Sequence, residues 1–263
     1  MKIQNVINYL EELAPLSYAE TFDNVGLLIG DTQTNVTGIL VTLDSLETTV
    51  DEAIAKKCNL IVSFHPIIFS GLKKINGNSY VERVVLKAIK NNIAIYAMHT
   101  ALDNIKKGVS GKICEVLKLK NTEILIPKTN LKTKETIGMG MIGELESAMS
   151  EKDFIQYLKK TMKTDCVRHS EFLEKTIKKV AVLGGSGSFA IENAINLKAD
   201  AYVSADFKYH DFFKAEKQIL LTDIGHYESE QFTKNLLVEY LTKKFTNFAV
   251  ILSEKSTNPI YYS

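Results

Sequence analysis

His226 and Glu230 combine two side-chain types that bind divalent cations, and they stand four residues apart. They follow the apolar run 218–222 and open a stretch with helical periodicity, so we expect both at the start of a helix. Residues four apart project from one face of a helix and can reach one ligand. An imidazole beside a carboxylate suits zinc, manganese or iron. The alternative interpretation is a solvated helix start, which is the more frequent origin of such a pair.

Two further histidines follow apolar runs that are typical of strands. The run 60–69 is interrupted by Pro66, which cannot donate to a sheet ladder, so the strand should stop there and leave His65 at its carboxyl end. The run 93–98 ends in His99, and Asp103 follows four residues later. Functional side chains of α/β sheets gather at the carboxyl ends of strands. We therefore expect His65, Asp103, His226 and Glu230 to form one metal site, with His99 and Asp206 as candidate cleft contacts. The alternative is that each of these side chains lies in solvent at the end of its strand and binds no metal.

Composition is that of an ordinary soluble globular protein. The 263 residues are 45% hydrophobic and 24% charged, with 32 basic against 31 acidic residues. Near-zero net charge does not indicate a nucleic-acid or anionic-membrane surface, and no apolar run reaches membrane-spanning length. Cys58, Cys114 and Cys166 are odd in number and lack CxxC spacing, so we expect reduced thiols and a cytoplasmic location.

The order of the expected elements repeats along the chain. Residues 41–63 read as strand, helix and strand, and residues 182–204 read as the same elements over the same length. Each half then continues through another helix to a strand followed by a histidine, with an acidic residue four positions later. The pattern predicts an α/β fold of two similar lobes from an internal duplication, with helices packed on mixed sheets and a metal cleft between the lobes. The polar segment 121–135 is predicted to connect lobes 1–126 and 127–263, with no inserted middle domain.

A glycine-rich turn supports a rival function. Gly185-Ser186-Gly187 begins a G-x-G-x-x-A pattern between an expected strand and an expected helix, and Asp206 follows about 20 residues later. That arrangement is typical of nucleotide or dinucleotide binding. The structural alternative, which we favour, is a tight strand-to-helix turn, because the corresponding N-terminal position carries Asp44 and Ser45 instead.

The sequence resembles a known family, the GTP cyclohydrolase I type 2 homologues, also called Nif-three-like dinuclear metal-centre proteins. The resemblance extends in order over nearly the whole chain. It lies in Phe22-Asp-Asn-Val-Gly-Leu-Leu-Ile-Gly30, His65-Pro66-Ile-Ile-Phe69, His99-Thr-Ala-Leu-Asp-Asn104, Lys208-Tyr-His-Asp211 and Gly225-His-Tyr-Glu-Ser-Glu230.

The resemblance implies two related α/β lobes, a toroidal homohexamer, and two metal ions in the cleft between the lobes. Carboxylate and imidazole ligands permit zinc, iron, manganese or nickel. Carried over by position, His65 and Asp103 resemble ligands of one ion, His226 resembles a ligand of the other, and Glu230 resembles a bridge. Lys208 and His210 are candidate substrate contacts by the same resemblance, and a solvated helix start is their alternative.

Phe64 departs from the family pattern, which usually has two adjacent histidines before the proline. A phenylalanine cannot bind a cation, so we expect one or two ions per chain, with the second site weakened or empty, or with His99 compensating. The predicted function is a metal-dependent hydrolase that acts through a metal-activated water on a small molecule, GTP ring opening being the nominal reaction. The alternative is a non-catalytic metal-binding regulatory or scaffold ring, which the loss of a ligand at Phe64 favours.

Overall fold

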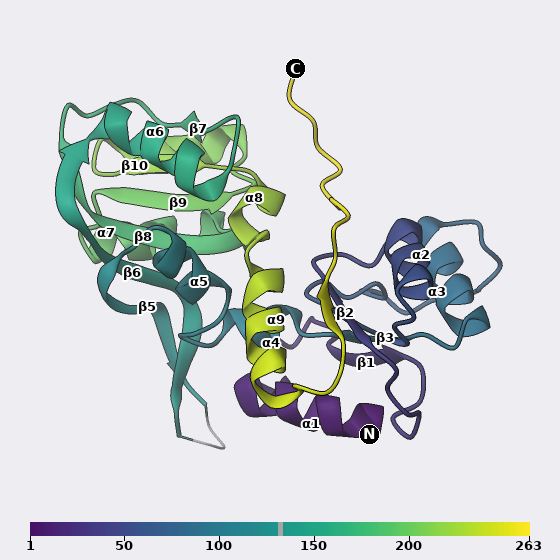
Figure 1. Ribbon diagram of the computed structural model, residues 1–263. Helices are drawn as coiled ribbons and strands as arrows, with labels where there is room; N and C mark the ends of the chain where they lie inside the picture. The colour runs from purple at the N-terminus through teal and green to yellow at the C-terminus, as the bar shows by residue number, and fades with distance from the viewer. Residues whose placement is uncertain (131–133) are drawn as a thin grey trace. The chain divides into compact units, whose positions relative to one another are not determined.

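The structure is a computed structural model that describes residues 1–130 and 134–263. It divides into two compact units (Figure 1). The first comprises Met1–Leu102 and Thr233–Thr257, and the second comprises Asp103–Phe232 and Asn258–Ser263. Each unit contains one mixed sheet with helices packed on it, which confirms the predicted α/β class.

In the first unit the described strands form a sheet in the order β1-β4-β3-β2-β11, in which β1 is antiparallel to β4 and all other neighbours are parallel. Helices α2 and α3 bury Val50, Ala53, Val84 and Ala88 against one sheet face. Tyr9 of α1 stacks on Tyr240 of α9, with ring centroids 4.3 Å apart. The elements are α1 (Ile3–Leu13), η1 (Leu16–Tyr18), β1 (Gly26–Ile29), β2 (Ile39–Thr42), α2 (Glu47–Ala55), β3 (Leu60–Ser63), α3 (Tyr80–Lys90), β4 (Ala94–Ala97), α4 (His99–Asp103, whose last residue is assigned to the second unit), α9 (Thr233–Lys244) and β11 (Val250–Leu252).

In the second unit the described strands form a sheet in the order β5-β6-β8-β9-β10-β7. Helices α5 and α6 cover one face through residues such as Ile113 and Phe154, and α7 and η3 cover the other through residues such as Ile191 and Ala215. The elements are α5 (Val109–Val116), β5 (Lys120–Thr129), β6 (Thr136–Ser150), α6 (Glu151–Met162), β7 (Arg168–His169), β8 (Thr176–Ser186), η2 (Ser188–Ala190), α7 (Ile191–Asn196), β9 (Ala201–Ala205), η3 (Tyr209–Ala215), β10 (Leu220–Asp223) and α8 (His226–Glu230).

The two sheets contain the same arrangement, as expected for a duplicated unit. Strands β2, β3 and β4 are parallel neighbours in that order, and so are β8, β9 and β10. Each set then carries an antiparallel edge strand, β1 beside β4 and β7 beside β10. The carboxyl ends of β3 and β4, and of β9 and β10, therefore hold equivalent places in their units.

The division of the chain differs from the one predicted at residues 126 and 127. That boundary falls inside β5, which pairs antiparallel with β6, so most of the segment 121–135 is a strand; residues 131–133 lie outside the described residues. Thr122, Lys128 and Thr129, which helped to suggest a connector, belong to this largely exposed edge strand, where charged side chains are usual.

The stretch with helical periodicity that opens at His226 is divided into two helices. Its first five residues form α8 in the second unit, and the stretch resumes as α9 in the first. Phe232 packs against the core of the second unit, whereas Leu237 and Leu241 are buried in α9. Strand β11 then pairs with β2, so residues late in the sequence complete the sheet of the first unit. Among the described residues, no helix is long and apolar enough to span a membrane.

Candidate metal centre

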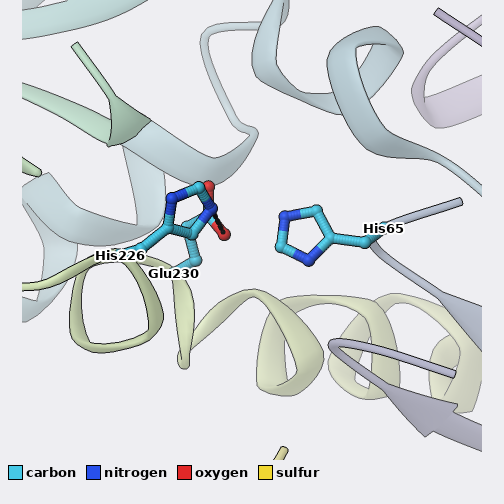
Figure 2. Close-up of side chains that lie close together, drawn as sticks. All are labelled: His65, His226 and Glu230. Carbon is cyan, nitrogen blue, oxygen red and sulfur yellow. Dashed lines mark ion pairs between the residues drawn. The ribbon is translucent and has the colours of Figure 1, made fainter. Parts of the chain in front are cut away.

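His226 and Glu230 lie together on α8, as their spacing predicts. Figure 2 shows their side chains next to each other. The distance from His226 Nε2 to Glu230 Oε2 is 3.2 Å, and the Glu230 side chain is only 4% exposed. A buried carboxylate needs a cation or several hydrogen-bond donors close to it. Ser229 on the same helix accepts a hydrogen bond from the backbone N–H of Gly185, which ties α8 to the end of β8. The pair is therefore held against the carboxyl end of the sheet.

Asp206 holds the other ring nitrogen of His226. It directly follows β9, and its Oδ2 lies 2.7 Å from His226 Nδ1 and also accepts a hydrogen bond from the Ser186 hydroxyl. Burial lowers the pKa of His226, but hydrogen bonds and charge interactions with Asp206 and Glu230 outweigh it and raise the pKa to about 11. The hydrogen bond with His226 in turn lowers the pKa of the Asp206 carboxyl. The two carboxylates thus create a place that favours positive charge.

The glycines of the predicted nucleotide-binding turn have contacts of their own. Gly185 has a φ of +70°, and a Cβ there would lie 2.4 Å from Glu230 Oε1. A Cβ on Gly187 would lie 2.0 Å from Ser204 Oγ. Backbone conformation and close approach within the protein therefore account for both glycines. The Asp206 carboxylate, predicted by the rival function to bind a ribose, is engaged by His226 and Ser186.

In the first unit, His65 and His99 are held in the same way. Each lies two residues beyond the end of its strand, β3 or β4. His65 Nδ1 is 2.8 Å from Asp44 Oδ1, and His99 Nδ1 is 2.8 Å from Asp23 Oδ1. A carboxylate on Nδ1 leaves Nε2 as the nitrogen that can bind a metal, which is the usual environment of histidine ligands.

Aromatic rings surround these two histidines. Phe64 is fully buried, with its ring centroid 4.8 Å from that of His65 and 5.6 Å from that of His99. The two imidazole centroids are 5.3 Å apart. Phe64 therefore adds an apolar ring beside His65, where a second histidine would have added a nitrogen donor.

The remaining predicted residues are placed as follows. Asp103 is the last residue of α4 and is half-buried. Lys208 and His210 are exposed at the start of η3, where the Lys208 N–H donates to Asp211. The structure thus brings together Asp206, His226 and Glu230 in the second unit, and His65 and His99 in the first.

Sequence reasoning named Asp206 as a cleft contact but missed Asp44 and Asp23, which orient the imidazoles of His65 and His99. Asp44 follows β2 just as Asp206 follows β9, and each serves a histidine from the neighbouring strand. An acidic residue at the end of the strand before each histidine was a usable signal. Asp23 gives no such signal, because it precedes β1 and reaches His99 only through antiparallel pairing of β1 with β4.

The fold agrees with the comparison to known families and structures. A family model described as Duf34/NIF3 (NGG1p interacting factor 3) matches residues 1–259. The chain belongs to this family.

Individual relatives support the assignment. The chain is 33% identical to a "GTP cyclohydrolase 1 type 2 homolog" of Clostridium acetobutylicum over 266 residues, which cover 98% of each chain. It is 32% identical to a protein of the same name from Campylobacter jejuni over 263 residues, with all of both chains covered. Among solved structures, a hypothetical protein of Staphylococcus aureus matches with a TM-score of 0.94 and 32% identity, over 100% of this chain and 99% of that one.

Proposed function

We propose that this protein is a metal-dependent hydrolase. The observation that carries the proposal is the arrangement around His226 on α8. Its Nε2 lies 3.2 Å from Oε2 of the buried Glu230, and its Nδ1 contacts the carboxylate of Asp206. Metal-binding histidines characteristically have a carboxylate on the second nitrogen. The names of the C. acetobutylicum and C. jejuni relatives support a hydrolytic reaction on a nucleotide-like substrate.

The proposed ligands are His65, Asp103, His226 and Glu230. Two imidazoles and one carboxylate, from His65, His226 and Glu230, are a donor set that suits zinc, iron, manganese or nickel. Asp103 adds a second carboxylate, and Glu230 has two oxygens with which it can serve two ions.

The charges of the second unit support the binding of a cation beside Glu230. The proposal is supported by the raised pKa of His226, which reflects the negative charge of Asp206 and Glu230 on either side of the ring; a divalent cation could take the place of the proton on Nε2. The absence of a side chain at Gly185 gives Glu230 its space. Because Glu230 is buried, its charge is poorly solvated and gains more from a cation than an exposed carboxylate would.

When bound, a divalent cation would polarise a substrate oxygen and lower the pKa of a water molecule. The chain's own residues have separate tasks. Asp44 and Asp206 keep the rings of His65 and His226 in place through Nδ1, and Ser229 fixes α8 to β8. His99, Lys208 and His210 are the proposed contacts for a small-molecule substrate.

A second candidate function is a metal-binding regulatory or scaffold ring without catalysis. The observation that favours it is Phe64, which is completely buried beside His65 and offers no donor atom. Loss of one donor harms two-metal catalysis more than structural metal binding. Under either function we propose a homohexamer in the cytoplasm, the latter because Cys58, Cys114 and Cys166 are free thiols.

The test is turnover of GTP, phosphoesters and cyclic amides by purified, metal-loaded protein, with Glu230→Ala as the matched variant. We expect hydrolysis of at least one class, and its loss both in Glu230→Ala and after chelation. Activity that survives Glu230→Ala would contradict the proposed site. Tight metal binding without turnover of any class would favour the regulatory ring.

A further inference from the structure

Three histidines share one arrangement, in which ring Nδ1 contacts a carboxylate that also accepts a hydrogen bond from a hydroxyl group. It occurs in both units and on different strand ends, so it is not an accident of one loop. The sets are His226 with Asp206 and Ser186, His65 with Asp44 and Thr257, and His99 with Asp23 and Thr100.

Among the three aspartates of these sets, Asp206 is the one with an unusual backbone conformation. Its φ of +58° lies in the left-handed region, which is uncommon for a residue other than glycine, asparagine or aspartate. It directly follows β9, and its Oδ2 contacts both His226 Nδ1 and the Ser186 hydroxyl. The carboxylate is thus fixed by one neighbour from β8 and one from α8, on either side of its own strand.

We propose that Asp206 is the positioning residue for His226. It sets the orientation of the imidazole and keeps a proton on Nδ1, so that Nε2 faces Glu230 as the metal-binding nitrogen. This inference rests on the proposed metal site. In this role Asp206 acts through His226, since its Oδ2 contacts the ring nitrogen Nδ1 and is held in place by the Ser186 hydroxyl.

Two substitutions separate this role from a structural one. Asp206→Gly removes the carboxylate, and glycine adopts a positive φ without strain, so the turn is preserved. Asp206→Asn also tolerates this backbone conformation and keeps an oxygen acceptor while removing the charge. Glu123→Gln is the matched control. Glu123 is exposed on β5, an edge strand of the same sheet that is not a neighbour of β9, and its substitution also removes one negative charge.

The first measurement is the Zn²⁺ affinity of the full chain, by competition with a chromophoric chelator. We expect Asp206→Gly to weaken binding by about 10- to 100-fold, as loss of an orienting partner generally does. Asp206→Asn should lie between it and the wild type, and Glu123→Gln should bind like the wild type. Thermal unfolding of the metal-free proteins shows that each variant is folded.

The second measurement is the imidazole region of the proton–nitrogen spectrum of the Zn²⁺-loaded protein. We expect slowly exchanging Nδ1–H signals from His65, His99 and His226, and loss of the His226 signal in Asp206→Gly. Wild-type Zn²⁺ affinity together with a retained His226 signal in that variant would overturn the positioning role and leave the metal site standing. A wild-type protein that binds no Zn²⁺ would overturn both.

Discussion

At the scale of single residues, the candidate site depends on carboxylates that hold imidazoles. The sequence identified His65, His99, His226 and Glu230 because they follow apolar runs or stand at helical spacing. It did not identify Asp23 or Asp44 as partners, because a contact between strand ends depends on which strands are neighbours. Strand order is a property of the folded sheet, and local sequence pattern does not contain it.

Phe64 leads to a prediction about metal content. It supplies no donor beside His65, so we expect elemental analysis to find about one tightly held ion per wild-type chain. Phe64→His should raise that number. An unpaired imidazole in this buried position would cost about 1–3 kcal/mol of stability without metal, part of which metal binding should restore. Two tightly bound ions in the wild type would contradict the prediction.

Asp23 leads to a prediction about pH. Burial raises its pKa, but hydrogen bonds from His99 and Thr100 outweigh this and lower the pKa below 3.8. A carboxyl whose folded pKa is lowered contributes stability that is fully present above its unfolded pKa, and this contribution is lost as the pH falls through the folded value. The stability difference between wild type and Asp23→Asn should therefore be constant near neutral pH and shrink below about pH 4.

Urea unfolding at a series of pH values measures this difference. Asp165→Asn is a suitable control, because Asp165 is exposed. A difference between wild type and Asp23→Asn that stays constant down to pH 2 would contradict the assignment.

At the scale of elements, helix α8 packs closely against Gly185 near the end of β8. Gly185 combines a positive φ with the close approach of Glu230, so Gly185→Ala should strain the backbone by about 1–2 kcal/mol and displace the carboxylate. We expect a lower melting temperature and at least tenfold weaker Zn²⁺ binding.

Gly71→Ala is the matched control, since a Cβ at Gly71 meets no atom within 4 Å. Equal Zn²⁺ affinities for the two variants would show that Glu230 does not need this space.

Element prediction from sequence succeeded where apolar runs were strong, as in the strands that precede the histidines. It failed at β5, whose exposed lysines and threonines resemble a linker. It also joined α8 to α9, because the apolar pattern continues through Phe232 although Phe232 and Leu237 belong to the cores of different units. Hydrophobic pattern reports burial and does not say in which core a residue is buried.

At the scale of the whole molecule, the sheet of the first unit depends on β11. The Ile39 N–H donates to Ala249, and the Ser253 N–H donates to Val41, so β11 covers the edge of β2. Truncation after Phe245 should expose that edge and speed amide hydrogen exchange of Ile39 and Val41 at least tenfold.

Truncation after Thr257 keeps β11 and the contact of Thr257 with Asp44, so it should leave this exchange unchanged. Similar protection of β2 in both truncated proteins would show that β11 is dispensable for the first unit.

The late position of β11 has a consequence for synthesis on the ribosome. Strands β1 to β4 emerge first, yet β2 remains an open edge until residues 250–252 have been translated, after the whole main segment of the second unit. The nascent chain therefore carries β2, whose four residues are all buried in the folded protein, with one edge unpaired through most of its elongation. Codon changes that slow translation between β10 and β11 should prolong this exposure, and the yield of soluble protein should fall with the length of the pause.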